Sequence, residues 1–189
     1  LKKLRLIPLT KWDLENIANL MGEEIINRVA KSPLITLELK SFSPKYERVA
    51  LDIKEWLYKG LILKEKEFRA HLKSHNWDQF LNKNVAIYCS SDVIIPNWAY
   101  MLVAIKLAPF VKFSLLGSLE ELEIALFNGN IDSLEIENFK NKKVLIKGCS
   151  ETYIPDSAYL SITNKLLPVV DSIMFGEACS NVPLFKKPK

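Results

Sequence analysis

The chain has 189 residues, 49% of them hydrophobic and 25% charged, a composition that is typical of one folded domain and excludes a disordered chain. Its longest uninterrupted apolar run, from Trp98 to Ile105, is far shorter than the ~20 residues of a membrane-spanning helix, so we expect a cytoplasmic protein with no membrane partner. The net charge of +4 arises at the two ends, where residues 1–21 and 186–189 hold seven of the 26 basic and two of the 22 acidic residues. Because 19 basic and 20 acidic residues remain between these ends, we expect no nucleic-acid partner.

The chain is expected to contain an N-terminal extension and one domain. Position 1 is Leu and the first Met is Met21. We interpret residues 1–21 as an extension that is either disordered or upstream of a native start at Met21. Residues 22–189 are then expected to form a single α/β domain, of which residues 22–80 are the N-terminal part.

The N-terminal part predicts two helices and a pair of strands. Acidic residues followed by apolar residues at helical spacing predict a short helix over 23–31. The segments 34–39 and 48–53 are strand-like and flank a turn at Ser41–Pro44, so they predict an antiparallel pair. A second helix is expected over 64–73.

From residue 84 onward, short apolar strands alternate with helices. We expect strands at 84–88, 111–116, 144–147 and 169–175, and helices at 96–108, 118–129 and 155–166. Ser118 and Glu121 form the capping-box pattern at the start of the second of these helices. The alternation predicts an α/β fold with a three-layer core, in which helices cover a parallel sheet.

An internal repeat supports this interpretation. Residues 84–117 align without gaps with residues 143–176, and 12 of the 34 positions are identical. Each copy predicts a strand, a loop, a helix and a strand, and two such units in succession predict a four-stranded parallel run of the doubly wound type. Ligands of such sheets bind at the carboxyl ends of the strands, so we expect the functional residues at that edge.

The three cysteines of the chain all follow predicted strands closely. They are Cys89, Cys149 and Cys179, and a Ser follows each of them. If the strands belonged to one parallel sheet, the three thiols would lie along one edge. Cys89 and Cys149 would also lie just before helix N-termini, which stabilise thiolates.

Three converging thiolates suit Zn²⁺ or an iron–sulfur cluster. The candidates for a fourth ligand are Asp92, Glu151, Glu177 and His75. The pattern lacks a Cys-x-x-Cys spacing, and two alternatives stay open. The cysteines can be core residues of a non-catalytic interaction module. Alternatively, one of them, with Cys149 the leading candidate, is the nucleophile of a thiol-dependent enzyme.

Five distinctive segments are spread over most of the chain: GEEIINRVAKSPLITLEL, ERVALDIKEWLYKGLILKEKEFR, CSSDVIIPNWAYM, KGCSETYIPDSAY and FGEACSNVPLFKK. With them, the sequence resembles an uncharacterised bacterial family, a domain of unknown function. The resemblance covers about residues 22–187 and leaves residues 1–21 outside it. Members of this family tend to be encoded near iron–sulfur cluster assembly genes. The resemblance therefore implies an accessory protein in cluster assembly, with assembly proteins as partners.

The expected sheet also has an open edge. An unpaired edge strand can pair with another chain, so this edge offers a place for a homodimer contact.

Overall fold

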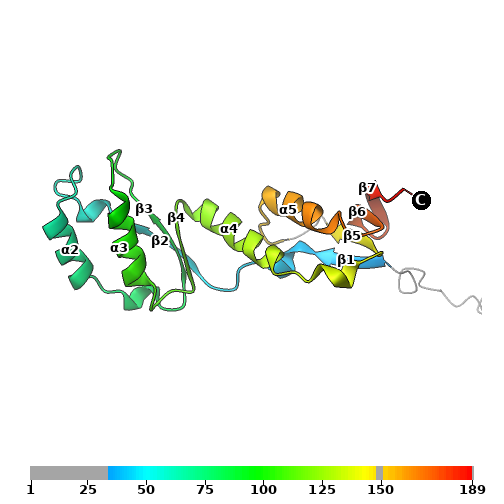
Figure 1. The fold of residues 1–189 in the computed structure, drawn as a ribbon, viewed down its shortest axis with the longest axis horizontal. Coiled ribbons are helices and arrows are strands. Elements are labelled where there is room, and N and C mark those ends of the chain that lie inside the picture. The colour runs from blue at the N-terminus through cyan, green and yellow to red at the C-terminus, as the bar shows by residue number, and fades with distance from the viewer. Residues whose placement is uncertain (1–33, 148–150, 189) are drawn as a thin grey trace, which may run out of the picture. The chain divides into compact units, whose positions relative to one another are not determined.

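The computed structural model describes residues 34–147 and 151–188, which form an α/β fold with two separate sheets (Figure 1). The expected α/β class is confirmed, as are the parallel strands and the presence of an antiparallel strand pair. The extension 1–21, the expected helix at 23–31 and Cys149 lie outside the described residues.

The first sheet contains three parallel strands in the order β2, β3, β4. Helices α2 and α3 cover one face and share a buried core with Val85 and Ile87 of β3, while α4 contacts β2 and β3 (Figure 1). The central strand, NVAIY, is therefore buried over most of its length, as expected for a covered parallel strand. The elements are β2 (Arg48–Asp52), β3 (Asn84–Tyr88), β4 (Phe113–Leu116), α2 (Glu65–Ser74), α3 (Asn97–Leu107) and α4 (Leu119–Asp132).

The second sheet has four strands in the order β1, β5, β6, β7. Strands β5 and β6 are parallel, and β6 and β7 form an antiparallel hairpin. A second core contains Phe127 and Ile131 of α4, Ile162 of α5 and Ile173 of β6, all fully buried. The elements are β1 (Leu34–Glu38), β5 (Lys143–Lys147), β6 (Ser172–Glu177), β7 (Ser180–Lys186) and α5 (Asp156–Leu166).

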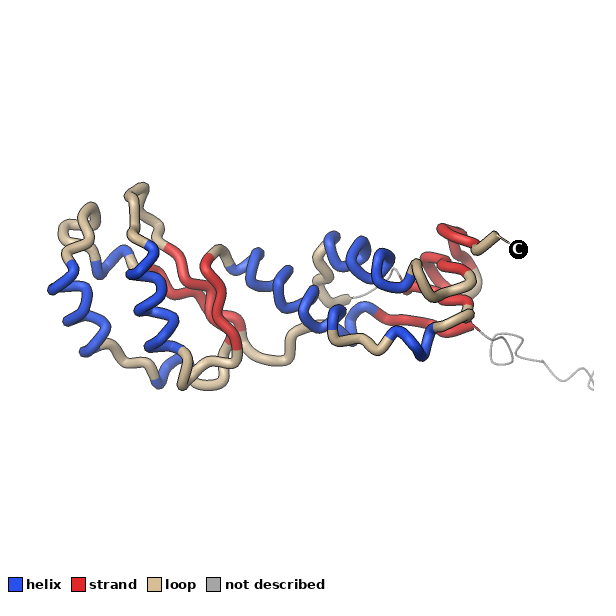
Figure 2. The backbone as a smooth tube through the Cα atoms, viewed as in Figure 1, coloured by secondary structure: helices blue, strands red, loops and turns tan. Residues whose placement is uncertain are grey.

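The expected four-stranded parallel run is wrong, because the two repeat copies lie in different sheets (Figure 2). Strand β3 of the first copy pairs with β2, whereas β5 of the second copy pairs with β1. Each copy thus completes its own sheet with a strand from the N-terminal part. Helix α4 connects the copies, and its last two turns bury Phe127 and Ile131 in the second core.

The predicted pairing of 34–39 with 48–53 is also wrong. These segments are β1 and β2, which lie in different sheets, and the antiparallel pair is β6 with β7. The predicted hairpin fails because a 3₁₀ turn at Leu39–Phe42 follows β1 and buries Leu39 and Phe42 in the second core. The chain then continues to β2, which runs parallel to β3.

The backbones of the two copies match in detail. Asn82 and Asn141, 59 positions apart, both adopt a positive φ, of 60° and 54°. The N–H of Asn82 donates to the oxygen of Phe110 and the N–H of Asn141 to that of Val169, each over 2.8 Å. Asn tolerates this left-handed conformation better than most residues, which explains its presence at both positions.

The predicted capping box at the start of α4 is confirmed. At the start of α4, the N–H of Glu121 donates to Ser118 Oγ over 3.1 Å and the N–H of Ser118 to Glu121 Oε2 over 2.7 Å, which is the predicted capping box. Within residues 34–147 and 151–188, no helix is long and apolar enough to span a membrane.

Candidate thiol and carboxylate sites at the strand ends

Each sheet carries a carboxylate at the carboxyl end of its N-terminal strand. Asp52 ends β2 and Glu38 ends β1. A buried apolar residue follows each: Ile53 after Asp52 and Leu39 after Glu38. In parallel sheets this edge is where ligands bind. The two carboxylates therefore mark comparable positions in the two sheets.

In the second sheet, Glu38 belongs to a network of charges. Its carboxylate lies 2.8 Å from Lys40 Nζ and 3.2 Å from Lys147 Nζ, and Lys147 lies 3.7 Å from Glu177. Hydrogen bonds from Lys40 and Lys147 lower the pKa of Glu38, and the bond to Glu38 raises the pKa of Lys147. Since Glu38, Lys147 and Glu177 end β1, β5 and β6, side chains from three strands converge at this edge.

Two cysteines belong to this second copy. Cys179 is exposed in the turn between β6 and β7, two residues after Glu177. Cys149 follows Lys147, the last residue of β5, by two positions along the chain. Strands β5 and β6 are parallel neighbours, so both cysteines follow strands that end at the same edge.

In the first sheet, Asp52 holds the loop that follows β3. Its Oδ1 accepts hydrogen bonds from the N–H of Ser90 over 3.1 Å and from the N–H of Lys54 over 3.0 Å. Burial raises the pKa of the Asp52 carboxyl, but these hydrogen bonds outweigh burial, and the pKa lies below its ordinary value. The carboxylate is therefore held ionised beside Ser90, the residue that follows Cys89.

Cys89 is half-buried and packs against the core of the first sheet, in contrast to the exposed Cys179. Tyr100 of α3 packs against the same core. Burial raises the pKa of the Tyr100 hydroxyl, and the negative charges of Cys89 and Asp52 in their ionised forms raise it further.

The predicted single edge for all three thiols is wrong. Cys89 follows a strand of the first sheet and Cys179 a strand of the second. The geometric premise fails because the copies form separate sheets. Among the residues that the structure describes, no three His, Cys, Asp or Glu side chains are grouped closely enough to hold a metal ion.

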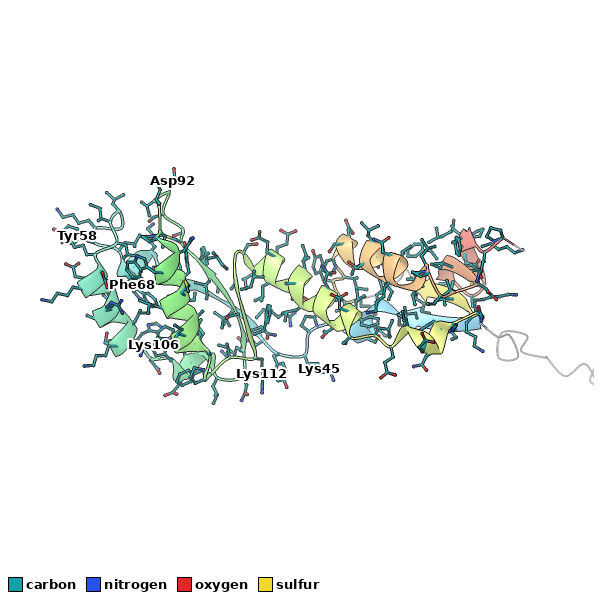
Figure 3. All side chains as sticks on the ribbon, in the orientation of Figure 1. Lys45, Tyr58, Phe68, Asp92, Lys106 and Lys112 are labelled. Atoms are coloured by element: carbon teal, nitrogen blue, oxygen red, sulfur yellow. The ribbon has the colours of Figure 1, made fainter. Side chains whose placement is uncertain are left out.

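The candidate fourth ligands lie in different surroundings. Asp92 is exposed at the tip of the loop between β3 and α3, as Figure 3 shows, and Glu151 is exposed in the corresponding loop of the second copy. Glu177 lies beside Lys147 in the charge network of the second sheet. Glu151 and Glu177 each lie two positions from a cysteine of the second copy, and Glu177 also contacts Lys147.

His75 lies in an aromatic cluster at the end of α2. Its ring packs edge-to-face against Trp56 and Trp77, with centroids 5.0 and 4.8 Å away, and stacks on Phe80. Its Nε2 lies 3.0 Å from the Gln79 amide nitrogen. Burial lowers the pKa of His75, so the ring is neutral at physiological pH and serves packing.

The reasoning from sequence missed the carboxylates Asp52 and Glu38 and the amine of Lys147. A signal for the carboxylates was present: LITLEL over 34–39 and RVALDI over 48–53 share the order apolar, any residue, Leu, acid, apolar. This second similarity marks β1 and β2 as equivalent strands. No comparable pattern indicated Lys147, because its equivalent in the first copy is Tyr88.

The fold and these strand-end groups define a class: an α/β protein made of two related strand–helix–strand copies, each completed by its own N-terminal strand. The chain belongs to the family described as protein of unknown function (DUF2480), whose family model matches residues 23–187. The resemblance to a domain-of-unknown-function family is thus confirmed. No curated protein and no solved structure matches the chain.

Proposed function

We propose that the chain binds a soft metal ion, zinc or the iron of an iron–sulfur cluster, through thiolates at the carboxyl ends of β5 and β6. Cys149 and Cys179 are the thiolate ligands, and Glu177 is the leading candidate for an additional ligand. Thiolates are the ligands that both zinc and iron–sulfur clusters prefer. Cys89 lies in the other copy and takes no part in this centre.

One observation carries the proposal. The side chains of Glu38, Lys147 and Glu177 converge from three neighbouring strand ends, with Lys147 Nζ 3.2 Å from Glu38 and 3.7 Å from Glu177. Cys149 and Cys179 each follow one of these strands by two residues. A convergence of side chains at the edge where parallel sheets bind ligands favours a site there.

Lys147 gives this site its electrostatic character. Thiolate is the form of cysteine that binds metal, and the ammonium group of Lys147 brings positive charge to the strand ends that Cys149 and Cys179 follow. The Lys147 ammonium forms ion pairs with Glu38 and Glu177, which hold it at the strand ends.

The test is metal analysis of the full chain purified without oxygen. We expect close to one site of zinc or iron per chain in the wild type, retained in Cys89→Ser and largely lost in Cys149→Ser and Cys179→Ser. Cys89→Ser is the matched control, since it removes a thiol of the other copy. A wild type without zinc or iron, with all three thiols freely alkylated, contradicts the proposal. Equal loss of metal in Cys89→Ser contradicts the assignment to the second copy.

The proposal extends to an accessory role in iron–sulfur cluster assembly in the cytoplasm. A reducing cytoplasm keeps an exposed thiol such as Cys179 available. Iron together with acid-labile sulfide in the purified chain supports this role, and assembly proteins are then its expected partners. Zinc as the sole bound metal contradicts the assembly role but leaves the thiolate centre in place.

The packing of Cys89 favours a second candidate, an interaction module with structural cysteines. A half-buried cysteine that packs against a core behaves as a small apolar residue. If this function is correct, a variant with all three cysteines replaced by Ala or Ser keeps its partners. Loss of partners in that variant supports the thiolate centre instead.

A further inference from the structure

The outer strand of the first sheet has an open edge, whereas its counterpart in the second sheet is covered. Strand β4 pairs with β3, and the part of the chain that the structure describes supplies no other neighbour to it. Its repeat equivalent, β6, pairs with β5 on one side and with β7 on the other. The second copy therefore shows what completes this type of edge: an antiparallel strand.

The backbone of β4 shows which of its groups are free to pair. The N–H of Gly117 donates to the oxygen of Ile87 on β3 over 2.8 Å. Because backbone groups of alternate residues point to the same side of a strand, those of Leu115 also face β3. The backbone groups of Ser114 and Leu116 then point outward, away from β3.

The helix beside this edge has an apolar outer face. Met101 and Ile105 lie one turn apart on α3 and are 64% and 66% exposed. Leu116 on β4 is 57% exposed. In the second copy, the equivalent of Ile105 is the polar Asn164, although Leu160, the equivalent of Met101, is also apolar and 65% exposed.

A cavity of about 220 Å³ lies where this helix meets the open edge. It is lined by Ile87, Tyr100, Met101, Ala104, Ser114, Leu115 and Leu116. Ile173 occupies the place of Ser114 in the second copy, where it is fully buried and pairs with Phe185 of β7. Phe185 packs against the second core. The first copy thus lacks both large side chains that fill the corresponding place in the second.

From these observations we infer that a second copy of this chain covers the open edge, with β4 antiparallel to the partner's β4 about a two-fold axis at Leu115. In this register Ser114 lies opposite the partner's Leu116, and both residues have outward backbone groups, so they form hydrogen-bonded pairs. Directly opposed residues of antiparallel strands share a face. The partner's Leu116 therefore lies on the face of Ser114 and enters its cavity, in the role that Phe185 has in the second copy.

Self-complementarity favours a second copy over an unrelated partner. One strand supplies both the small residue, Ser114, and the projecting residue, Leu116, two positions apart. A two-fold axis lets each subunit fill the other's cavity, and it places Met101 and Ile105 against their counterparts on the partner helix. Such an isologous contact closes on itself and leaves β4 without an open edge.

Sedimentation equilibrium of the full chain tests this interface. We expect a wild-type dimer, and dissociation constants raised about 100-fold in Met101→Lys and in Leu116→Lys, because a buried Lys without a partner opposes association. Leu160→Lys is the matched control: it alters the repeat equivalent of Met101, with nearly the same exposed fraction, and leaves the dimer intact. Thermal unfolding checks that each variant is folded.

A backbone variant provides independent evidence. Ser114→Pro removes an outward N–H and leaves the hydrogen bonds of β3 untouched, and edge strands tolerate Pro at such positions. We expect it also to weaken the dimer. A monomeric wild type at concentrations of about 100 μM overturns the inference. A dimer that survives Leu116→Lys also overturns it. In that case residues 1–33 or a different partner would be the occupant of the β4 edge.

Discussion

Leu107 and Leu166 occupy equivalent positions in the two copies, and both are fully buried at the ends of their helices. Ile105 and Asn164 are also equivalent and both exposed, yet one is apolar and the other polar. The buried end of this helix is thus the same in both copies, while a neighbouring exposed position differs. This difference accompanies a difference between the sheets: among the described residues, β7 covers the outer edge of the second copy, whereas no strand covers the outer edge of the first.

The largest effect on stability is expected at the buried position that the two copies share. Leu107→Ala and Leu166→Ala each remove a fully buried side chain at the same repeat position, and each should lower the free energy of unfolding by about 3 kcal/mol. Urea unfolding of the two variants measures this. A much smaller loss in one variant would show that the two cores are not equivalent.

A smaller effect distinguishes the carboxylates of the two sheets. Asp52→Asn should cost about 1 kcal/mol at pH 7, since Asp52 accepts two backbone hydrogen bonds as a charged group. The folded state lowers the pKa of Asp52, so its contribution is complete above the ordinary Asp pKa. It is lost as the pH falls through the folded-state pKa. Urea unfolding from pH 7 to pH 3 should therefore show the variant converging with the wild type, and a constant difference would contradict this.

The smallest effect is expected at the equivalent carboxylate of the second sheet. Glu38→Gln removes two exposed ion pairs, with Lys40 and Lys147, and such pairs contribute little and are screened by salt. We expect a slight fall in Tm at low ionic strength that disappears in about 1 M salt. Since the pKa of Glu38 is lowered, the effect also disappears at acid pH. A fall in Tm that persists in high salt would indicate a role in packing instead.

The helices and the repeat were predictable from the sequence because their signals are local. Pro96 and Pro155 lie immediately before α3 and α5, and the capping box at Ser118 begins α4. Strand β7 was not predicted, because SNVPLFK contains Pro183 and lacks a strand pattern. Pro183 is tolerated where the pairing with β6 is irregular, between Ile173 and Met174.

The candidate site was predictable only in part. Cys89 and Cys179 do follow strand ends, as β3 and β6 place them. Their common edge was not predictable, since a repeat of strand, helix and strand is equally compatible with one sheet or two. The partner strand decides between these, and here β1 and β2 each join a different copy. Strand partners depend on contacts distant in sequence, which local patterns do not encode.

The tight hairpin that carries Cys179 has a practical consequence. Gly176 has a φ of +125°, and a Cβ added there would lie 2.6 Å from the Ser180 oxygen, so no larger residue fits without moving β7. This close contact fixes the sulfur at an exposed tip, where a maleimide dye should attach faster than at the half-buried Cys89. A fluorophore on that tip would report on events at the end of β6.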